Sequence, residues 1–188
     1  RLVVLAASVF QNPRLLLNSA TDRFPSGLAN SSGLVGRYLF GEGMSLVYGL
    51  FEEETECHMG VSAGQLTHRE SWAHASRPGV FGGLQWQIGP AVKPNDIYGF
   101  AITRSDLFGQ PLHDFIRTAS RHFAYIVGFC GGEPSAENRV ELAERRDSNG
   151  MPLARAVHTT PEGVAALRAY MERQGRAAVE AAGARDVW

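Results

Sequence analysis

Three small residues at the end of an apolar run carry the clearest chemical signal near the start of the chain. Leu2–Ala7 is a continuous apolar stretch of strand length, and Ser8 follows it. Ala6, Ala7 and Ser8 would let a ligand approach the backbone closely, and a helix that follows would point the positive end of its dipole at that ligand. The same residues would also suit a tight strand-to-helix corner without a ligand, so both interpretations stay open.

Histidine and cysteine supply no evident metal-binding set. No two of the six histidines have i, i+4 spacing; they are His58, His68, His74, His113, His122 and His158. We interpret each as a surface or packed structural residue. Cys57 and Cys130 lack CxxC spacing and cannot form a complete iron–sulfur ligand set. We interpret them as unpaired thiols, although a disulfide between them in an oxidising compartment stays open.

Composition and charge exclude some classes of partner. The 188 residues are 44% hydrophobic and 20% charged, which is ordinary for a globular domain. A net charge of -1 gives no reason to propose binding to nucleic acid or to an anionic membrane. Leu2–Ala7 is too short to span a bilayer, which takes about 20 apolar residues, and it lacks a signal-peptide pattern. Because the chain opens inside what reads as a buried strand, we expect an internal fragment of a longer protein.

The elements that would position the small residues form half of a βαβ unit. Leu2–Ala7 has the pattern of a strand buried on both faces. Asn12 and Pro13 predict the start of a short helix, with Asn12 as the N-cap, that ends near Ser19 or Ala20.

The rest of the chain alternates strand patterns with two further helices. Strands are predicted over Met44–Phe51 and Phe123–Cys130, strands and loops over Val61–Pro94, a short helix over Pro111–Arg121, and a hairpin from Glu137–Leu142 to Leu153–His158. Asp147–Gly150 predicts the turn of that hairpin. The clearest helix has Thr160 as N-cap and Gly183 as its stop.

Two early segments and the C-terminal stretch resemble the glucose–methanol–choline (GMC) flavoprotein oxidoreductases. Ser8–Ser19 resembles the second signature of that family, and Asn30–Leu39 resembles the next block. Asn138–Trp188 is similar to the segment leading to the catalytic block in the sugar and polyol dehydrogenase branch, which includes gluconate and fructose dehydrogenase flavoprotein subunits. The chain departs from the family pattern at Val9, Asn12, Ala20 and Phe40-Gly41-Glu42.

The resemblance implies FAD as cofactor and an α+β fold with an α/β edge. Residues 1–40 would be the end of a Rossmann-like FAD-binding domain, and 41–188 an antiparallel-sheet substrate domain with flanking helices. Cofactor contacts are then expected first at Ala6, Ala7 and Ser8, beside the adenosine half of FAD. Gly36 and Arg37 come next, and Arg37 suits a structural ion pair as well as a cofactor contact.

The resemblance also implies an activity. The protein would oxidise CH–OH groups of sugars, polyols or sugar acids, passing hydride to flavin N5, while a histidine outside this chain takes the hydroxyl proton. The phosphate-binding glycine loop would lie upstream of Arg1, so no catalytic residue is assigned here. Four aromatic residues would line the substrate pocket or fill the core: Trp72, Phe81, Trp86 and Tyr98.

Partners and compartment follow from the resemblance alone. It implies an alcohol or sugar substrate, an electron-acceptor subunit, and a periplasmic or membrane-associated location reached through partners. The rival interpretation is a non-catalytic α+β binding or interaction domain that shares a strand–turn–helix. A nicotinamide dehydrogenase is disfavoured, because no glycine fingerprint with a downstream acidic residue is present.

Overall fold

The chain divides into two compact units. The computed structural model describes residues 2–59, 64–66, 82–89 and 92–188. The first unit comprises Arg1–Gly41 and Gly132–Glu162, and the second comprises Glu42–Gly131 and Gly163–Trp188. Helices and antiparallel sheets make up both, so the predicted α+β class is confirmed. The assignment of 1–40 and 41–188 to two functional domains stays a prediction.

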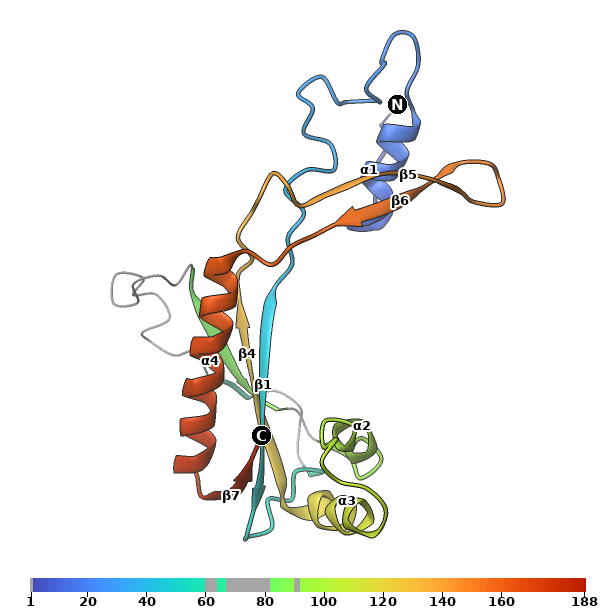
Figure 1. Cartoon of the computed structure of the whole chain (residues 1–188). Coiled ribbons are helices and arrows are strands. Elements are labelled where there is room, and N and C mark those ends of the chain that lie inside the picture. Colours follow the sequence, from blue (N-terminus) through green and yellow to red (C-terminus); the bar gives the residue numbers. More distant parts are fainter. Residues whose placement is uncertain (1, 60–63, 67–81, 90–91) are drawn as a thin grey trace. The chain divides into compact units, whose positions relative to one another are not determined.

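The first unit is a helix packed on a β-hairpin. Helix α1 (Ser8–Asn18) packs against strands β5 (Arg139–Arg146) and β6 (Pro152–Val157), which pair antiparallel (Figure 1). The backbone amides of Asn149 and Met151 donate to Asp147 Oδ1 and so close the turn between the strands. The predicted hairpin and its turn are confirmed.

The strand predicted over Leu2–Ala7 is wrong. These residues form no strand and are exposed, with Leu2, Val3 and Val4 at 89%, 82% and 75%. Apolar content makes a strand only where a neighbouring strand accepts its hydrogen bonds, and no described residue pairs with this run. Asn12 is also not the N-cap, because the helix already begins at Ser8 and Pro13 lies inside it.

The second unit is built on a five-stranded antiparallel sheet. Its order is β2 (Gly64–Leu66), β3 (Leu84–Ile88), β4 (Phe123–Cys130), β1 (Gly43–Phe51) and β7 (Ala184–Val187). The central strands β1 and β4 pair from Gly43 with Cys130 to Leu50 with Phe123. The strands predicted from the β-branched and aromatic runs are confirmed, whereas β7 is an addition that the sequence did not indicate.

Helices cover both faces of this sheet. Helix α4 (Glu162–Ala181) lies along one face, and α2 (Ile97–Ala101) with α3 (Gln110–His122) lies at one end of the other (Figure 1). The α4 side buries Leu84, Cys130, Val164, Leu167 and Met171. The α2/α3 side buries Leu50, Val92, Ile97, Ala101, Phe115, Ala119 and Phe123. The flanking helices expected for an antiparallel-sheet domain are therefore present.

Glycine in α4 has a packing reason. Gly175 weakens the helix by about 1 kcal/mol relative to Ala, but a Cβ there would lie 2.8 Å from both Trp86 and Val47. The helix can approach the sheet this closely because the position has no side chain. Gly183, two positions beyond the end of α4, adopts φ +97, as a C-terminal stop requires.

Candidate cofactor-contact segment and sheet face

The turn that precedes α1 is held from inside the helix. The Ala7 N–H donates to Asn12 Oδ1 at 2.9 Å, and Asn12 Nδ2 donates to the Leu5 carbonyl at 3.4 Å. The Gln11 N–H reaches Ser8 Oγ at 3.4 Å. Ala6, Ala7 and Ser8 are all exposed. The turn therefore presents three small residues and the start of a helix on an accessible surface.

Ser8 has an unusual backbone conformation for a residue with a side chain. Its φ is +89, a region that L residues other than glycine seldom occupy. Such a conformation costs on the order of 1–3 kcal/mol and is found preferentially at ligand-binding and active sites. The strain singles out one of the three predicted contact residues, and this signal could not be read from the sequence.

Gly36 lies between α1 and the hairpin. The Val140 N–H donates to its carbonyl at 2.7 Å, and a Cβ at this position would overlap the Val140 carbonyl oxygen. That same Cβ would lie 3.6 Å from Pro13 of α1. Because φ at Gly36 is +84, both the space and the backbone conformation require glycine here.

The Arg37 side chain holds backbone carbonyls. Its guanidinium donates to the carbonyls of Gly33 and Ala136, each at 3.3 Å. No carboxylate of the described residues forms an ion pair with it. Where a structural ion pair was the alternative to a cofactor contact, Arg37 instead bonds to backbone carbonyls.

The predicted contact residues share one unit, and four of the five lie at or beside one helix. Ala6, Ala7 and Ser8 precede or begin α1, while Gly36 packs beside its middle. Within the described residues, no hydrogen bond joins the turn to Gly36 or Arg37. The Leu39 N–H donates to the Asn138 carbonyl at 2.9 Å, so the segment that ends at Leu39 and the segment that begins at Asn138 meet in this unit.

Sequence reasoning missed two residues that fasten the hairpin. Arg14 donates to the Pro152 carbonyl at 2.7 Å and pairs with Asp147 at 2.5 Å. The Arg14 guanidinium holds the pKa of the Asp147 carboxyl below its usual range. Asn138 is 2% exposed, and its side chain accepts from the Thr159 N–H at 2.7 Å and donates to the Thr159 carbonyl at 2.9 Å. Both pairs join distant positions, so local sequence signals do not reveal them.

The α2/α3 face of the sheet in the second unit carries a cluster of aromatic rings. Tyr48 has its ring centroid 5.4–5.9 Å from those of Phe100, Phe123, Tyr125 and Trp188. Burial raises the pKa of the Tyr48 and Tyr125 phenols, which keeps both protonated. This cluster is the core beneath α2 and α3.

The other end of the same face carries amide and apolar side chains. Gln85, Phe129 and Met44 lie side by side across β3, β4 and β1, and Gln87, Val127 and Leu46 form the next row. Trp86 packs against Gly128 and Gly175 on the α4 side. Its neighbours Gln85 and Gln87 therefore point to the opposite face.

The four predicted pocket aromatics have different positions. Trp86 packs into the core on the α4 side of the sheet, as one of the two alternatives expected. Tyr98, on α2, is 65% exposed. Trp72 and Phe81 lie outside the described residues.

The histidines do not gather into a site. The described part of the chain holds no group of three metal-ligating side chains. His122 Nδ1 lies 3.1 Å from the Glu53 carbonyl at the end of α3. His68 and His74 are outside the described residues. The two cysteines are separate thiols in the structure, and burial raises the pKa of each.

An arginine anchors the end of β7. Arg104 pairs with Asp186 at 2.6 Å and with Asp106 at 2.8 Å, and its guanidinium lies over the rings of Phe115 and Trp188. The hydrogen bond from Arg104 holds the pKa of Asp106 below its usual range. Trp188 Nε1 donates to Thr103 Oγ1 at 2.8 Å. These contacts fix the register of β7 on the sheet.

The chain is similar to two dehydrogenases. It is 30% identical over 182 residues to a 2-methyl-1,2-propanediol dehydrogenase of Mycolicibacterium austroafricanum, covering 90% of this chain and 31% of the relative. It is 29% identical over 153 residues to a fructose dehydrogenase large subunit of Gluconobacter japonicus, covering 79% of this chain and 27% of the relative. No family model matches the chain.

These relatives support an oxidoreductase relationship. The chain spans less than a third of the length of either curated relative, and both are named as dehydrogenases.

Neither α1 nor any other helix in the described ranges has the length and apolar character needed to cross a membrane.

Proposed function

We propose that this chain is part of an FAD-dependent oxidoreductase that acts on CH–OH groups of sugars, polyols or sugar acids. The observation that carries the proposal is the similarity to two dehydrogenases over 90% and 79% of the chain. One relative is named for a diol and the other for a sugar. Their common chemistry is the oxidation of an alcohol carbon, and it favours this function over a non-catalytic binding domain.

The turn at Ala6, Ala7 and Ser8 fits a cofactor contact. It is exposed, its side chains are small, and Ser8 holds a strained φ of +89 at the start of a helix. Ala6 and Ala7 admit a close approach to the backbone, and the Ser8 hydroxyl offers a polar contact. Bound FAD would supply the acceptor for hydride from the alcohol carbon. Gly36 and Arg37 would act by shaping the loop that packs beside α1.

The end of the sheet face that carries Gln85 and Gln87 suits contact with a hydroxyl-rich substrate. Gln85 and Gln87 present amide groups that both donate and accept hydrogen bonds. Met44, which is 45% exposed, lies in the same row as Gln85. These residues would bind and orient the substrate. The base that takes the hydroxyl proton is a histidine outside this chain, and no catalytic residue is assigned here.

A protein partner and an extracytoplasmic location belong to the same proposal. One relative is named as a large subunit, which supports an electron-acceptor subunit as partner. Periplasmic or membrane-associated placement through that partner stays a prediction.

The function is tested on the purified full protein that contains this chain. We expect a visible flavin absorption spectrum that bleaches under anaerobic conditions when a suitable polyol or sugar is added, and that recovers with an artificial electron acceptor. Absence of flavin, together with failure to bind added FAD, would remove the proposal and leave the non-catalytic alternative.

The cofactor contact is tested separately. Ala7→Leu places bulk at the exposed turn and should lower the FAD content of the purified protein. Ala169→Leu, at an exposed position on α4, is the matched control and should leave FAD content unchanged. Equal FAD content in both variants would show that the turn does not touch the cofactor.

A further inference from the structure

One edge of β1 is paired over part of its length. Toward β4, pairing runs from Gly43 to Leu50. Toward β7, it covers Gly49–Phe51 and the two backbone hydrogen bonds between Tyr48 and Trp188, at 2.9 and 3.2 Å. Among residues 2–59, 64–66, 82–89 and 92–188, no strand pairs with positions 43–47 on this side.

The open positions on this edge can be assigned residue by residue. In a strand, the N–H and C=O groups of successive residues point alternately to the two neighbouring strands. Those of Tyr48 point toward β7, as its bonds to Trp188 show. The backbone N–H and C=O groups of Met44 and Leu46 therefore face the open side, while those of Ser45 and Val47 face β4. A strand edge with unpaired backbone N–H and C=O groups can pair with another strand.

The open stretch continues the line of β7. Strand β7 runs antiparallel to β1, and its register is fixed by Arg104 through Asp186. Its outer edge is already capped, because Arg176 of α4 donates to the Val187 carbonyl at 2.6 Å. A strand added to β1 beyond Tyr48 would thus extend β7 and keep the same direction.

Helix α4 places a second arginine beside the open stretch. Arg168 precedes Arg176 by two helical turns, about 12 Å, which corresponds to three or four strand residues. Its Cγ would lie 3.5 Å from a Cβ on Gly43, and its carbonyl accepts from Ser45 Oγ at 3.3 Å. Arg168 is exposed. It is therefore positioned to cap a strand here as Arg176 caps β7.

We propose that the β1 edge at Met44–Val47 binds an extended strand, in line with β7, from sequence of the full protein outside residues 1–188. The chain covers only 31% and 27% of its relatives, so proteins of this kind contain ample further sequence. Side chains of the added strand on the Leu46 face are apolar, and those facing Arg168 are small. The proposal does not depend on the proposed enzymatic function.

Residue-resolved hydrogen exchange tests the proposal on the full protein and on the 188-residue chain. In the full protein, the amides of Met44 and Leu46 should exchange at least about tenfold more slowly than in the shorter chain, as expected for a gained backbone hydrogen bond. Ser45 and Val47 should be protected in both, because they bond to β4. Fast exchange of Leu46 in the full protein would overturn the proposal. Protection already present in the shorter chain would also overturn it, and its dependence on concentration would reveal a second copy as the occupant.

Proline substitution gives a second test within the full protein alone. Leu46→Pro removes the N–H that the added strand would accept, whereas Leu46→Ala removes the side chain and keeps the N–H. Leu46→Pro should lower the unfolding midpoint of the full protein clearly further than Leu46→Ala does. Val187→Pro against Val187→Ala measures the cost of the proline ring itself, because the Val187 N–H points away from β1. If the proline and alanine variants differ in unfolding midpoint by no more at position 46 than at position 187, the added strand is contradicted.

Discussion

The two units of this chain are stabilised by different interactions. Of the buried apolar side chains in the described residues, Val140 alone belongs to the first unit, and all the others belong to the second. The first unit instead relies on side chains bonded to backbone, as with Arg14 to Pro152 and Asn138 to Thr159. The first unit thus has almost no hydrophobic core, whereas the second has one on each face of its sheet.

This difference indicates which surface needs a cover. A hydrogen bond makes a net contribution of about 0.5–1.5 kcal/mol to the free energy of unfolding, whereas full burial of one large apolar side chain contributes about 1.5–3 kcal/mol. The first unit leaves Leu2, Val3 and Val4 more than 70% exposed. Contiguous exposed apolar surface is a common feature of interaction sites. The candidate cofactor turn adjoins that run.

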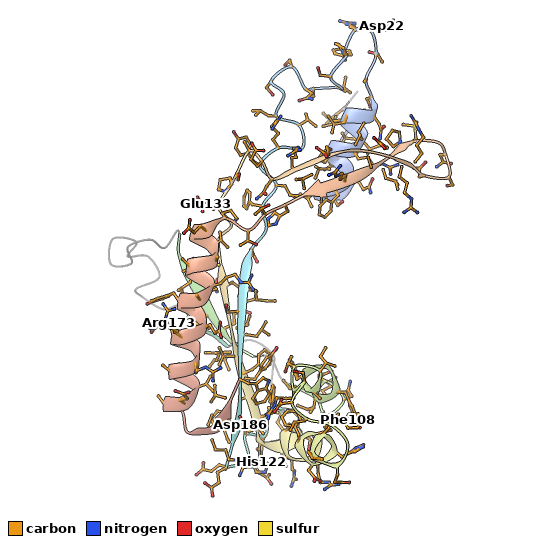
Figure 2. All side chains as sticks on the ribbon, in the orientation of Figure 1. Asp22, Phe108, His122, Glu133, Arg173 and Asp186 are labelled. Carbon is orange, nitrogen blue, oxygen red and sulfur yellow. The ribbon has the colours of Figure 1, made fainter. Side chains whose placement is uncertain are left out.

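Truncating the core of the second unit should have the largest effect. Phe123 is fully buried within the aromatic cluster, so Phe123→Ala should lower the free energy of unfolding by about 3–5 kcal/mol. Phe108, before α3, is 90% exposed (Figure 2), and Phe108→Ala should change it by less than about 0.5 kcal/mol. Urea unfolding followed by tryptophan fluorescence reports this unit, since Trp86 and Trp188 lie in it. Similar losses in both variants would refute the role of the core.

Glycine substitutions should separate space from backbone conformation in the first unit. Gly36→Ala meets both a φ of +84 and the Val140 carbonyl, so it should cost more than about 2 kcal/mol. Gly33→Ala meets only a φ of +70, with nothing within 4 Å, and should cost about 1 kcal/mol. Native-state hydrogen exchange of the β5–β6 amides measures both. Equal costs would mean that the contact with Val140 is not tight.

The elements that local signals specify were predictable. The Asp147 turn, the α3 and α4 helices and the β4 strand follow from turn chemistry, capping and apolar periodicity, which act within a few residues. The β7 strand was not predictable, because its partner Gly49–Phe51 lies more than 130 positions away and the pairing is invisible locally. The Leu2–Ala7 strand failed for the complementary reason, since its composition fits a strand but no described neighbour accepts it.

The residues of the candidate site could be named from the sequence, whereas their contacts and backbone conformations could not. The small residues before α1 and the glycine at 36 could be named from sequence patterns. The contact of Gly36 with Val140 and the pairing of Arg14 with Asp147 depend on how the hairpin returns to α1. The strained φ of Ser8 could not be foreseen, because a serine normally avoids that region.

Acid should weaken the first unit through Asp147. Its carboxyl pKa is held below the usual value, mainly by the Arg14 hydrogen bond. A lowered folded-state pKa stabilises the fold above the unfolded value of about 3.9, and this stabilisation is lost as pH falls through the folded value. Opening of the β5–β6 hairpin, measured by hydrogen exchange corrected for the intrinsic rate at each pH, should therefore increase below about pH 4.

Two variants isolate this acid response. Asp147→Asn should open more readily near neutral pH and show a much flatter acid response. Asp22→Asn is the control, because Asp22 lies in a loop of the same unit (Figure 2) and has no ion pair with any described residue. An unchanged pH profile in Asp147→Asn would show that another carboxyl controls the hairpin.

Relieving the strain at Ser8 should have the smallest effect and test its purpose. Ser8→Gly permits the φ of +89 without a side-chain penalty, so the first unit should gain about 0.5–1 kcal/mol. Ser8→Ala keeps the strain and loses the Gln11 contact, so it should gain nothing. Exchange of the α1 amides measures both. If Ser8→Gly gains stability but the full protein then retains less FAD than the Ser8→Ala variant, which lacks the same hydroxyl, the strain serves ligand binding. If it gains stability with FAD content unchanged, the strained turn is a folding feature alone and the first unit has no ligand contact at this residue.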